Sequence, residues 1–517
     1  MLFNSAEFIF GFVPIVLFGF FWIASRFGNE SAILWLVLSS LFFYGWWDPS
    51  YLLIILSSMV CNYHLGRHIY NRKCKWLLTA GVVGNLAVLG YFKYAGFLVF
   101  NLAWLTNSDW SIENIVLPLA ISFFTFQQIA YLVDSYKQVT EEYRFIHYAL
   151  FVTFFPQLIA GPIVHHKEML PQFQSNNAFR VNANHIAIGI SIFAIGLFKK
   201  TVIADGMADY ANPVFNAADA GSAPDLLLAW SGILAYTFQI YFDFSGYSDM
   251  ALGLARMFGI ILPLNFYSPY KARSIAEFWR RWHITLSRFL RDYIYIPLGG
   301  NRKGQGYRYL FLMTTMLLGG LWHGAGWNFV IWGALHGGFL AVHQGWRLLS
   351  ERHAWLQLHA SIAWLITMLA VIVAWGFFRA TSLDGALSIL QGMVGLNGVA
   401  IPMAILARLG EVGVILQSWG VTGYHGGASH LVSAWIYCLL LIPVVVCLPT
   451  VQDLFRQHHA SLTNIEETAG AGFWLAPRFI RKLAWQPALV WASFSSLLLV
   501  IGLMTLGQVS DFLYFQF

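Results

Sequence analysis

Residues 319–338 read Gly-Gly-Leu-Trp-His-Gly-Ala-Gly-Trp-Asn-Phe-Val-Ile-Trp-Gly-Ala-Leu-His-Gly-Gly. The stretch is apolar apart from His323, His336 and Asn328. The segments on either side are long enough to cross a bilayer, which predicts that His323 lies at membrane depth, where ionisable groups are costly and usually functional. The glycines remove side chains where another helix or a ligand can approach. His323 is therefore the first candidate for a reaction centre.

The composition extends this prediction to the whole chain. Hydrophobic residues make up 58% of the 517 positions and charged residues only 10%, and the mean hydropathy is +0.61. Soluble proteins carry about a quarter charged residues, so an all-α polytopic membrane protein is predicted. The net charge of +6 is small and spread over loops, which argues against nucleic-acid binding.

The four cysteines give no sign of a disulfide framework or a metal site. Cys61, Cys74, Cys438 and Cys447 lie in or beside apolar runs without CxxC or histidine-pair spacing, so we expect buried, small apolar side chains. No ligand motif links the histidines either, and we expect no metal. The stretch 1–24 lacks a basic start and a cleavage site, which is typical of a first transmembrane helix rather than a signal peptide.

Apolar windows of bilayer length mark the expected spans. They lie near 6–24, 31–48, 51–66, 77–100, 115–134, 146–164, 185–204, 226–250, 308–322, 327–344, 359–378, 431–449 and 484–507. Several are short or interrupted by Gly and Pro. We therefore expect roughly eleven full transmembrane helices, with re-entrant or interfacial helices between them.

The distribution of lysine and arginine predicts the orientation. Three basic segments should be cytoplasmic: 67–75, 256–303 and 451–483, the last with Arg456, Arg478, Arg481 and Lys482. Two segments without lysine or arginine should face outward: 101–114 and 205–225. Both termini are then outside. The Gly-rich stretch 380–430 should face outward, and it could be a partner-docking surface, although a connecting loop is favoured. Lys199 and Lys200 fall at the outer end of a span, so either they extend to the interface or the span does not cross simply.

A first polar constellation lies in the expected span 226–250. Tyr241 to Asp249 read Tyr-Phe-Asp-Phe-Ser-Gly-Tyr-Ser-Asp, which puts two carboxylates and two hydroxyls into an apolar helix. These groups could orient a catalytic histidine or line a polar tunnel. The interpretation we favour is that they bond to neighbouring helices, as buried polar groups in lipid must.

A second constellation runs from Ile275 to Arg302. Helical spacing predicts ion pairs of Glu277 with Arg281 and of Arg288 with Asp292. The interleaved aromatic residues suit an amphipathic helix at the membrane interface. The arginines also suit a cytoplasmic mouth for an anionic substrate, and both interpretations can hold together. His283, flanked by Trp282 and Ile284, could turn inward towards the core, although a lone histidine at an interface is more often structural.

These features leave the function class open. No Gly-x-Ser-x-Gly elbow supports a serine hydrolase. A proton-linked transporter using the histidines is as compatible with the residues as an enzyme is.

Five motifs resemble the membrane-bound O-acyltransferase superfamily, and within it the alginate O-acetyltransferase branch. They are Phe154-Phe-Pro-Gln-Leu-Ile-Ala-Gly-Pro162, Tyr241 to Asp249, Phe278-Trp-Arg-Arg-Trp-His283, Leu290-Arg-Asp-Tyr-Ile-Tyr-Ile-Pro-Leu-Gly-Gly-Asn-Arg302 and Gly319-Gly-Leu-Trp-His-Gly324. The combination is highly specific, and the similarity thins over 385–517. The resemblance implies one membrane-embedded domain over 1–517, with core motifs in 115–345, more variable helices in 380–517 and a central tunnel.

The resemblance also implies a reaction and its machinery. A near-invariant histidine of the superfamily matches His323, and a second position, His in this branch, matches His283. Members look like the membrane half of systems that O-acetylate exported alginate, cellulose or peptidoglycan at the bacterial inner membrane, with cytoplasmic acetyl-CoA as donor and no bound cofactor. The acetyl group passes to an extracytoplasmic partner protein or directly to the polysaccharide. A related branch transfers D-alanine to teichoic acid, and a transporter of the donor is the other alternative.

Residue roles follow as expectations. His323 would be the general base, a role typically worth about 10²–10⁴-fold, or else an acetylated intermediate. His283 would bond the thioester carbonyl or the oxyanion. The arginines would meet the phosphates of CoA, and His336 would be structural. The further substrate contacts that we expect are Trp322, Asp243, Ser245, Arg280, Arg281, Arg288, Arg291, Asn301 and Arg302.

Overall fold

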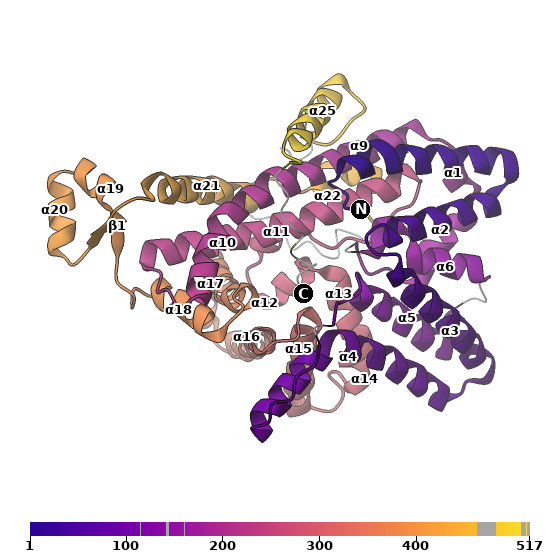
Figure 1. Ribbon diagram of the computed structural model, residues 1–517, viewed down its shortest axis with the longest axis horizontal. Helices are drawn as coiled ribbons and strands as arrows, with labels where there is room; N and C mark the ends of the chain where they lie inside the picture. The colour runs from indigo at the N-terminus through magenta and orange to yellow at the C-terminus, as the bar shows by residue number, and fades with distance from the viewer. Residues whose placement is uncertain (114, 141–143, 160, 463–481, 508–512, 514–517) are drawn as a thin grey trace.

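The computed structural model describes residues 1–113, 115–140, 144–159, 161–462, 482–507 and 513. Almost all regular structure in it is helical, which confirms the predicted all-α class. Arg478, Arg481 and Ala160 of the segments discussed above lie outside the described residues. Figure 1 shows most helices of the first third of the chain on one side, and the segment 400–424, in orange, projecting at the other.

The N-terminal helices lie close to the expected windows. They are α1 (Val13–Phe27, preceded by a π-helical turn Glu7–Phe12), α2 (Asn29–Gly45), α3 (Ser50–Arg72), α4 (Lys75–Thr106) and α5 (Ile121–Tyr136). Helix α5 begins later than the window 115–134, because Pro118 and the left-handed Ala120 (φ 59°) precede it. Helix α1 packs against α2, and both α3 and α4 pack against α5.

The window 146–164 is not one span, which corrects the prediction. The chain forms α6 (Phe145–Thr153), leaves the helix at Phe154 (ψ 107°), and starts the short α7 (Phe155–Leu158) with Pro156 in its first turn. Proline has no N–H to continue a helix but fits its first turn, so it starts a new helix rather than extending α6. The short α8 (His166–Gln174) follows.

The centre of the molecule is α11 (Leu226–Met257), which crosses the middle of Figure 1. It packs against α9 (Ala183–Phe198), α10 (Asp205–Asp219) and later helices. A π-helical stretch, Lys199–Ala204, joins α9 to α10, so the helix runs unbroken over Ala183–Asp219. The segment 205–225 is therefore mostly helix rather than loop.

The second half continues as short helices and then a hairpin. The short helices are α12 (Ile275–Arg281), α13 (Ile284–Leu290), a π-helical turn (Arg291–Tyr295) and α14 (Ile296–Leu298). The hairpin is α15 (Gln305–His323) and α16 (Trp327–Arg352), followed by α17 (Ala360–Arg379). Phe278, Trp282 and Phe289 are buried in the core and the chain breaks at His283, so this stretch is not one amphipathic helix; its position at the membrane interface stays a prediction.

The stretch 380–430 is also more than a connecting loop. It holds α18 (Leu383–Met393), α19 (Met403–Arg408), α20 (Glu411–Ser418) and the parallel strands β1 (Ala400–Pro402) and β2 (Thr422–Tyr424), in which Ala400 pairs with Thr422. The chain then forms α21 (Ala428–Cys447), α22 (Val451–Leu454) and α25 (Leu489–Met504).

Five helical segments in the described part of the chain are long and apolar enough to cross a membrane by length and composition. They are Glu7–Phe27, Lys75–Thr106, Ala183–Asp219, Ala360–Arg379 and Ala428–Cys447. The chain is a multi-pass membrane protein. The total of roughly eleven spans stays a prediction from the length rule.

Candidate active site

His323 is the last residue of α15, directly before the turn into α16. Gly324 (φ −164°) and Gly326 (φ −166°) are extended in that turn, and α16 begins at Trp327. The two helices can meet closely because glycines face each other: a Cβ on Gly320 would lie 3.2 Å from the Cα of Gly333. The predicted glycine-mediated approach of another helix is confirmed at this crossing.

Aromatic rings surround the His323 imidazole, which is 3% exposed. Its ring centroid lies 4.9 Å from Trp322, 5.0 Å from Trp332 and 5.1 Å from Phe378, each in an edge-to-face arrangement. Asn328 Nδ2 donates to the carbonyl of Ala380 at 2.6 Å, which ties the start of α16 to the end of α17. His323 therefore lies in a compact, apolar and water-poor setting.

His283 lies in the break between α12 and α13. It adopts a left-handed conformation (φ 42°, ψ 54°), which turns the chain sharply and directs the side chain into the core, where it is 0% exposed. Left-handed non-glycine residues are uncommon and gather at functional sites. The structure thus shows the inward orientation that the sequence allowed for His283.

The two histidines meet at Trp322. The Trp322 ring centroid is 6.0 Å from that of His283 and 4.9 Å from that of His323. Trp322 is fixed in turn by Phe126, which stacks on it at 5.3 Å, and by Phe123, which packs edge-on at 5.4 Å. The structure therefore gathers three of the predicted site residues from two separate segments.

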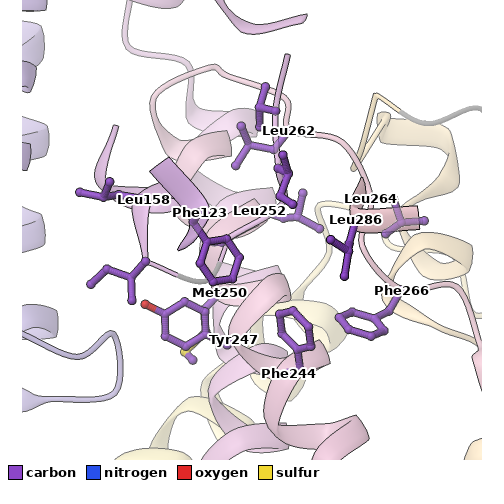
Figure 2. Packing of buried hydrophobic residues seen from close by; sticks show 14 of the residues in the cluster. Phe123, Leu158, Phe244, Tyr247, Met250, Leu252, Leu262, Leu264, Phe266 and Leu286 are labelled. Carbon is purple, nitrogen blue, oxygen red and sulfur yellow. The ribbon is translucent and has the colours of Figure 1, made fainter. Parts of the chain in front are cut away.

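Asn265 holds the imidazole of His283 from behind. Its Oδ1 accepts from Thr285 Oγ1 at 2.7 Å and lies 3.2 Å from Nδ1 of His283, while Ile284 N donates to the Asn265 carbonyl at 2.9 Å. Phe244 of α11 packs edge-on against the His283 ring, with centroids 4.8 Å apart. Figure 2 shows Phe244 beside Phe266, and Leu286 next to them.

His336 is separate from this pair. It is fully buried among aromatic rings, and its Nδ1 accepts from Trp279 Nε1 at 3.3 Å. Trp332 lies between it and His323, with ring centroids 4.7 Å and 5.0 Å from the two imidazoles. These contacts favour the structural role expected for His336.

The carboxylates of α11 pair with lysines. Lys200 Nζ lies 2.7 Å from Asp243 Oδ1 and 2.7 Å from Asp205 Oδ1, and all three side chains are buried. Lys199 Nζ lies 2.6 Å from Asp249 Oδ2. The favoured interpretation of helix–helix bonding therefore fits both carboxylates, and the substrate contact expected of Asp243 stays a prediction.

The same ion pairs correct the expectation for the two lysines. Lys199 and Lys200 turn inward to α11 instead of extending to the interface, and the helix is π-helical where they occur. Ser245 is also buried on α11.

The predicted arginine set divides into buried and exposed members. Arg281 is buried and pairs with Glu277 at 2.8 Å, as predicted. Arg288 pairs with Glu168 of α8 at 2.5 Å rather than with Asp292, which corrects that pairing. Asp292 instead accepts from its neighbour Arg291 at 2.7 Å.

The exposed members lie at the surface of the 275–302 region. Arg280, Arg291, Asn301 and Arg302 are exposed, and Asn301 accepts from Tyr295 Oη at 2.6 Å. Arg281 and Arg288 form ion pairs with glutamates of the protein, so the exposed arginines are the better placed to bind an anionic donor.

A polar cluster beneath the arginines was not predicted. Tyr293 Oη lies 3.1 Å from Asp134 Oδ1 and 3.2 Å from His165 Nδ1, and His166 Nδ1 lies 3.7 Å from Asp134 Oδ2. Burial lowers the pKa of His166 to about 4, so its imidazole is neutral at neutral pH. The cluster ties α5, α8 and the π-helical turn after α13 together.

Lys93 and Tyr94 are the other residues that the sequence analysis missed. Lys93 Nζ lies 2.5 Å from the carbonyl oxygen of Trp322 and 3.2 Å from that of His323, and Tyr94 Oη lies 2.7 Å from that of Leu321. A lysine inside the apolar window 77–100 was the available signal, since a charge at membrane depth is a functional candidate.

Two expectations concern metal ligands and thiols. In the described part of the chain, no group of three or more His, Cys, Asp or Glu side chains is arranged to hold a metal ion. The four cysteines form no disulfide with one another. Cys438 is buried as expected, whereas Cys61 is exposed on α3, which corrects its predicted burial.

Comparison with known proteins identifies the chain's relatives. The model of the membrane-bound O-acyltransferase family matches residues 41–384. A peptidoglycan O-acetyltransferase of Helicobacter pylori is 48% identical over 495 residues, 89% of this chain and 91% of that protein. A probable alginate O-acetylase, AlgI, of Azotobacter vinelandii is 36% identical over 536 residues and covers 100% of both chains. A teichoic acid D-alanyltransferase of Bacillus subtilis is 27% identical over 51% of this chain.

Proposed function

Because this chain belongs to the membrane-bound O-acyltransferase family, we propose that it transfers an acetyl group from cytoplasmic acetyl-CoA to a hydroxyl of an exported polysaccharide. The observation that carries the proposal is the convergence of two buried imidazoles, His283 and His323, on the Trp322 ring. We place the enzyme in the bacterial inner membrane, with the donor entering from the cytoplasm and the acceptor outside.

His323 acts as the general base. The acceptor hydroxyl oxygen attacks the thioester carbonyl carbon while the imidazole takes the hydroxyl proton. The carbon–sulfur bond then breaks, the new ester forms, and the leaving thiolate of CoA receives that proton from the imidazolium. The apolar rings around His323 favour its neutral form, which is the form that can accept a proton.

His283 has a different role, which depends on its contact with Asn265. An oxygen acceptor beside Nδ1 favours the tautomer with its proton on Nδ1, which leaves a lone pair on Nε2. Nε2 then accepts a hydrogen bond from a substrate N–H or O–H group. The oxyanion role expected from the sequence requires an Nε2–H, hence an imidazolium or an Asn265 amide turned by 180°. We assign His283 to holding the substrate.

The donor's phosphates meet the exposed arginines. Arg280, Arg291 and Arg302 are exposed around the 275–302 region, which the excess of basic residues predicts to be cytoplasmic. Guanidinium groups bind phosphate oxygens in paired, charge-assisted hydrogen bonds. Acetyl-CoA is a substrate here, and the reaction needs no bound cofactor.

The acceptor proposed first is peptidoglycan. The peptidoglycan O-acetyltransferase relative is 48% identical to this chain, against 36% for the alginate O-acetylase, whose match spans the full length of both. Alginate is therefore the second candidate. Transfer of D-alanine has weaker support, since that relative matches only 51% of the chain. An extracytoplasmic acetylation partner receives the acetyl group or presents the polysaccharide.

The test uses membrane vesicles that contain this chain and radiolabelled acetyl-CoA. Peptidoglycan strands and alginate oligomers are supplied in parallel with a purified extracytoplasmic partner, and a D-alanyl carrier protein replaces acetyl-CoA in a third arm. Label in the peptidoglycan ester fraction, removed by mild base, supports the proposal. Label only in alginate makes alginate the acceptor instead of peptidoglycan. Transfer only from the D-alanyl carrier overturns the acetyl assignment.

A further inference from the structure

Helix α4 presents two polar side chains to the end of α15 that carries His323. Lys93 Nζ donates to the carbonyls of Trp322 at 2.5 Å and His323 at 3.2 Å. Tyr94 Oη donates to the carbonyl of Leu321 at 2.7 Å. Two neighbouring residues of one helix therefore bind three consecutive carbonyls of another.

Those carbonyls have no partner within their own helix. The last four C=O groups of an α-helix lack an i+4 donor, and α15 ends at His323. In lipid no water replaces the missing donors, so each unsatisfied group costs several kcal/mol. Lys93 and Tyr94 supply the donors.

Lys93 has no carboxylate partner among the residues that the structure describes. Its ammonium lies near the middle of α4, in a segment apolar enough to cross the membrane. Its further contacts are Ser122 Oγ at 3.5 Å and the face of the Trp322 ring, whose centroid is 5.9 Å from Nζ. A lysine kept at membrane depth by carbonyls and an aromatic ring is costly, and its contacts all converge on Trp322 and His323.

Helix α4 also contacts the turn that follows His323. Asn101 Oδ1, two helical turns after Lys93, accepts from Trp327 Nε1 at 2.9 Å, and Phe97 packs against the Trp327 ring at 5.8 Å. Contacts from α4 therefore bracket residues 321–327 on both sides of the candidate base. The backbone that carries His323 is held by α4 as well as by α16.

We propose that Lys93 is a positioning residue for acyl transfer, which holds the carbonyl end of α15 by hydrogen bonds so that the His323 imidazole meets the acceptor hydroxyl in reactive geometry. The proposal rests on the proposed function, because it takes His323 as the base. A displacement of about 1 Å at a reacting group can cost about 10²-fold in rate, so loose anchoring of this helix end has a large effect on turnover.

The experiment compares Lys93→Met, Lys93→Arg and wild type in the vesicle assay, with kcat and KM for acetyl-CoA measured separately. Lys93→Met should lower kcat at least about tenfold per folded enzyme, with KM within about twofold, because the chemical step and not donor binding is affected. Lys93→Arg keeps a cationic donor and should recover a large part of kcat. Lys75→Met, at the exposed start of the same helix, is the matched control and should behave as wild type.

His323→Ala in the same assay separates the two levels of the proposal. A wild-type enzyme that transfers no acetyl group refutes the proposed function, and an active His323→Ala refutes the base. If both behave as expected but Lys93→Met keeps the wild-type kcat, the positioning role is overturned. Should Lys93→Met fail to fold, Lys93→Gln keeps an N–H donor on a side chain too short to keep both bonds, and its kcat should fall severalfold; a wild-type kcat in Lys93→Gln overturns the proposal.

Discussion

Gly320 of α15 and Gly333 of α16 face each other where the two helices cross. A Cβ built on Gly320 would lie 3.2 Å from both the Cα and the N of Gly333, and it would overlap the carbonyl oxygen of Phe329. A Cβ on Gly333 would lie 2.5 Å from the carbonyl oxygen of Met316. The obstacles are backbone atoms, which cannot rotate away, so this crossing sets how His323 is presented.

Replacing Gly320 by Ala should therefore destabilise the protein by about 1–3 kcal/mol and lower acetyl transfer, because the hairpin must open to admit the methyl group. Thermal unfolding in detergent and the vesicle assay measure the two effects. Gly338→Ala is the control, since a Cβ there meets nothing within 4 Å. Equal stability of the two variants would refute the close crossing.

His336 should prove structural. His336→Leu leaves the buried Trp279 indole without its acceptor, which should cost about 1–3 kcal/mol, while acetyl transfer per folded molecule stays within a few-fold of wild type. Adding Trp279→Phe removes the orphaned donor and should restore part of the stability. A loss of turnover as large as that of His323→Ala, in a stable His336→Leu protein, would give His336 a part in the chemistry.

The buried cluster around Lys200 should be a major source of stability. Lys200→Met leaves the buried carboxylates of Asp205 and Asp243 without their cation, and removing one partner of such a pair costs about 3–5 kcal/mol. Lys200→Met combined with Asn at both aspartates should unfold at a higher temperature than Lys200→Met alone. Wild-type melting of the single variant would show that the three charges do not depend on one another.

Exposed and buried arginines should differ in their effects on donor binding and on stability. Arg280→Gln removes an exposed charge and should raise KM for acetyl-CoA, more strongly at low than at high salt, with little change in stability. Arg281→Gln breaks a buried pair with Glu277 and should mainly lower the unfolding temperature. The opposite pattern, with donor affinity dependent on Arg281 and not on Arg280, would place the donor deeper in the protein.

The long apolar helices could be read from the sequence because length and hydropathy alone define them. The windows 308–322 and 359–378 differ from α15 and α17 by only a few residues. The interruptions could not be read in this way. The left-handed His283 and the π-helical Lys199–Ala204 depend on tertiary contacts, namely the bond to Asn265 and the ion pairs to α11, which a local pattern does not contain.

The sequence identified the candidate histidine but not the residues that hold it in place. His323 was recognisable as a titratable ring in an apolar stretch. Trp322 could be included because it directly precedes His323 in the sequence. Lys93 belongs to the same centre, although 229 positions separate it from Trp322. The periodicity of α4 gives no sign of which helix end its lysine would bind.

The most direct test of the account is the rate of acetyl transfer by His323→Ala, compared with wild type in vesicles containing equal amounts of folded protein. Loss of the general base should lower kcat by about 10²–10⁴-fold, with KM for acetyl-CoA little changed and the unfolding temperature close to that of wild type. Undiminished acetyl transfer by His323→Ala would contradict the account.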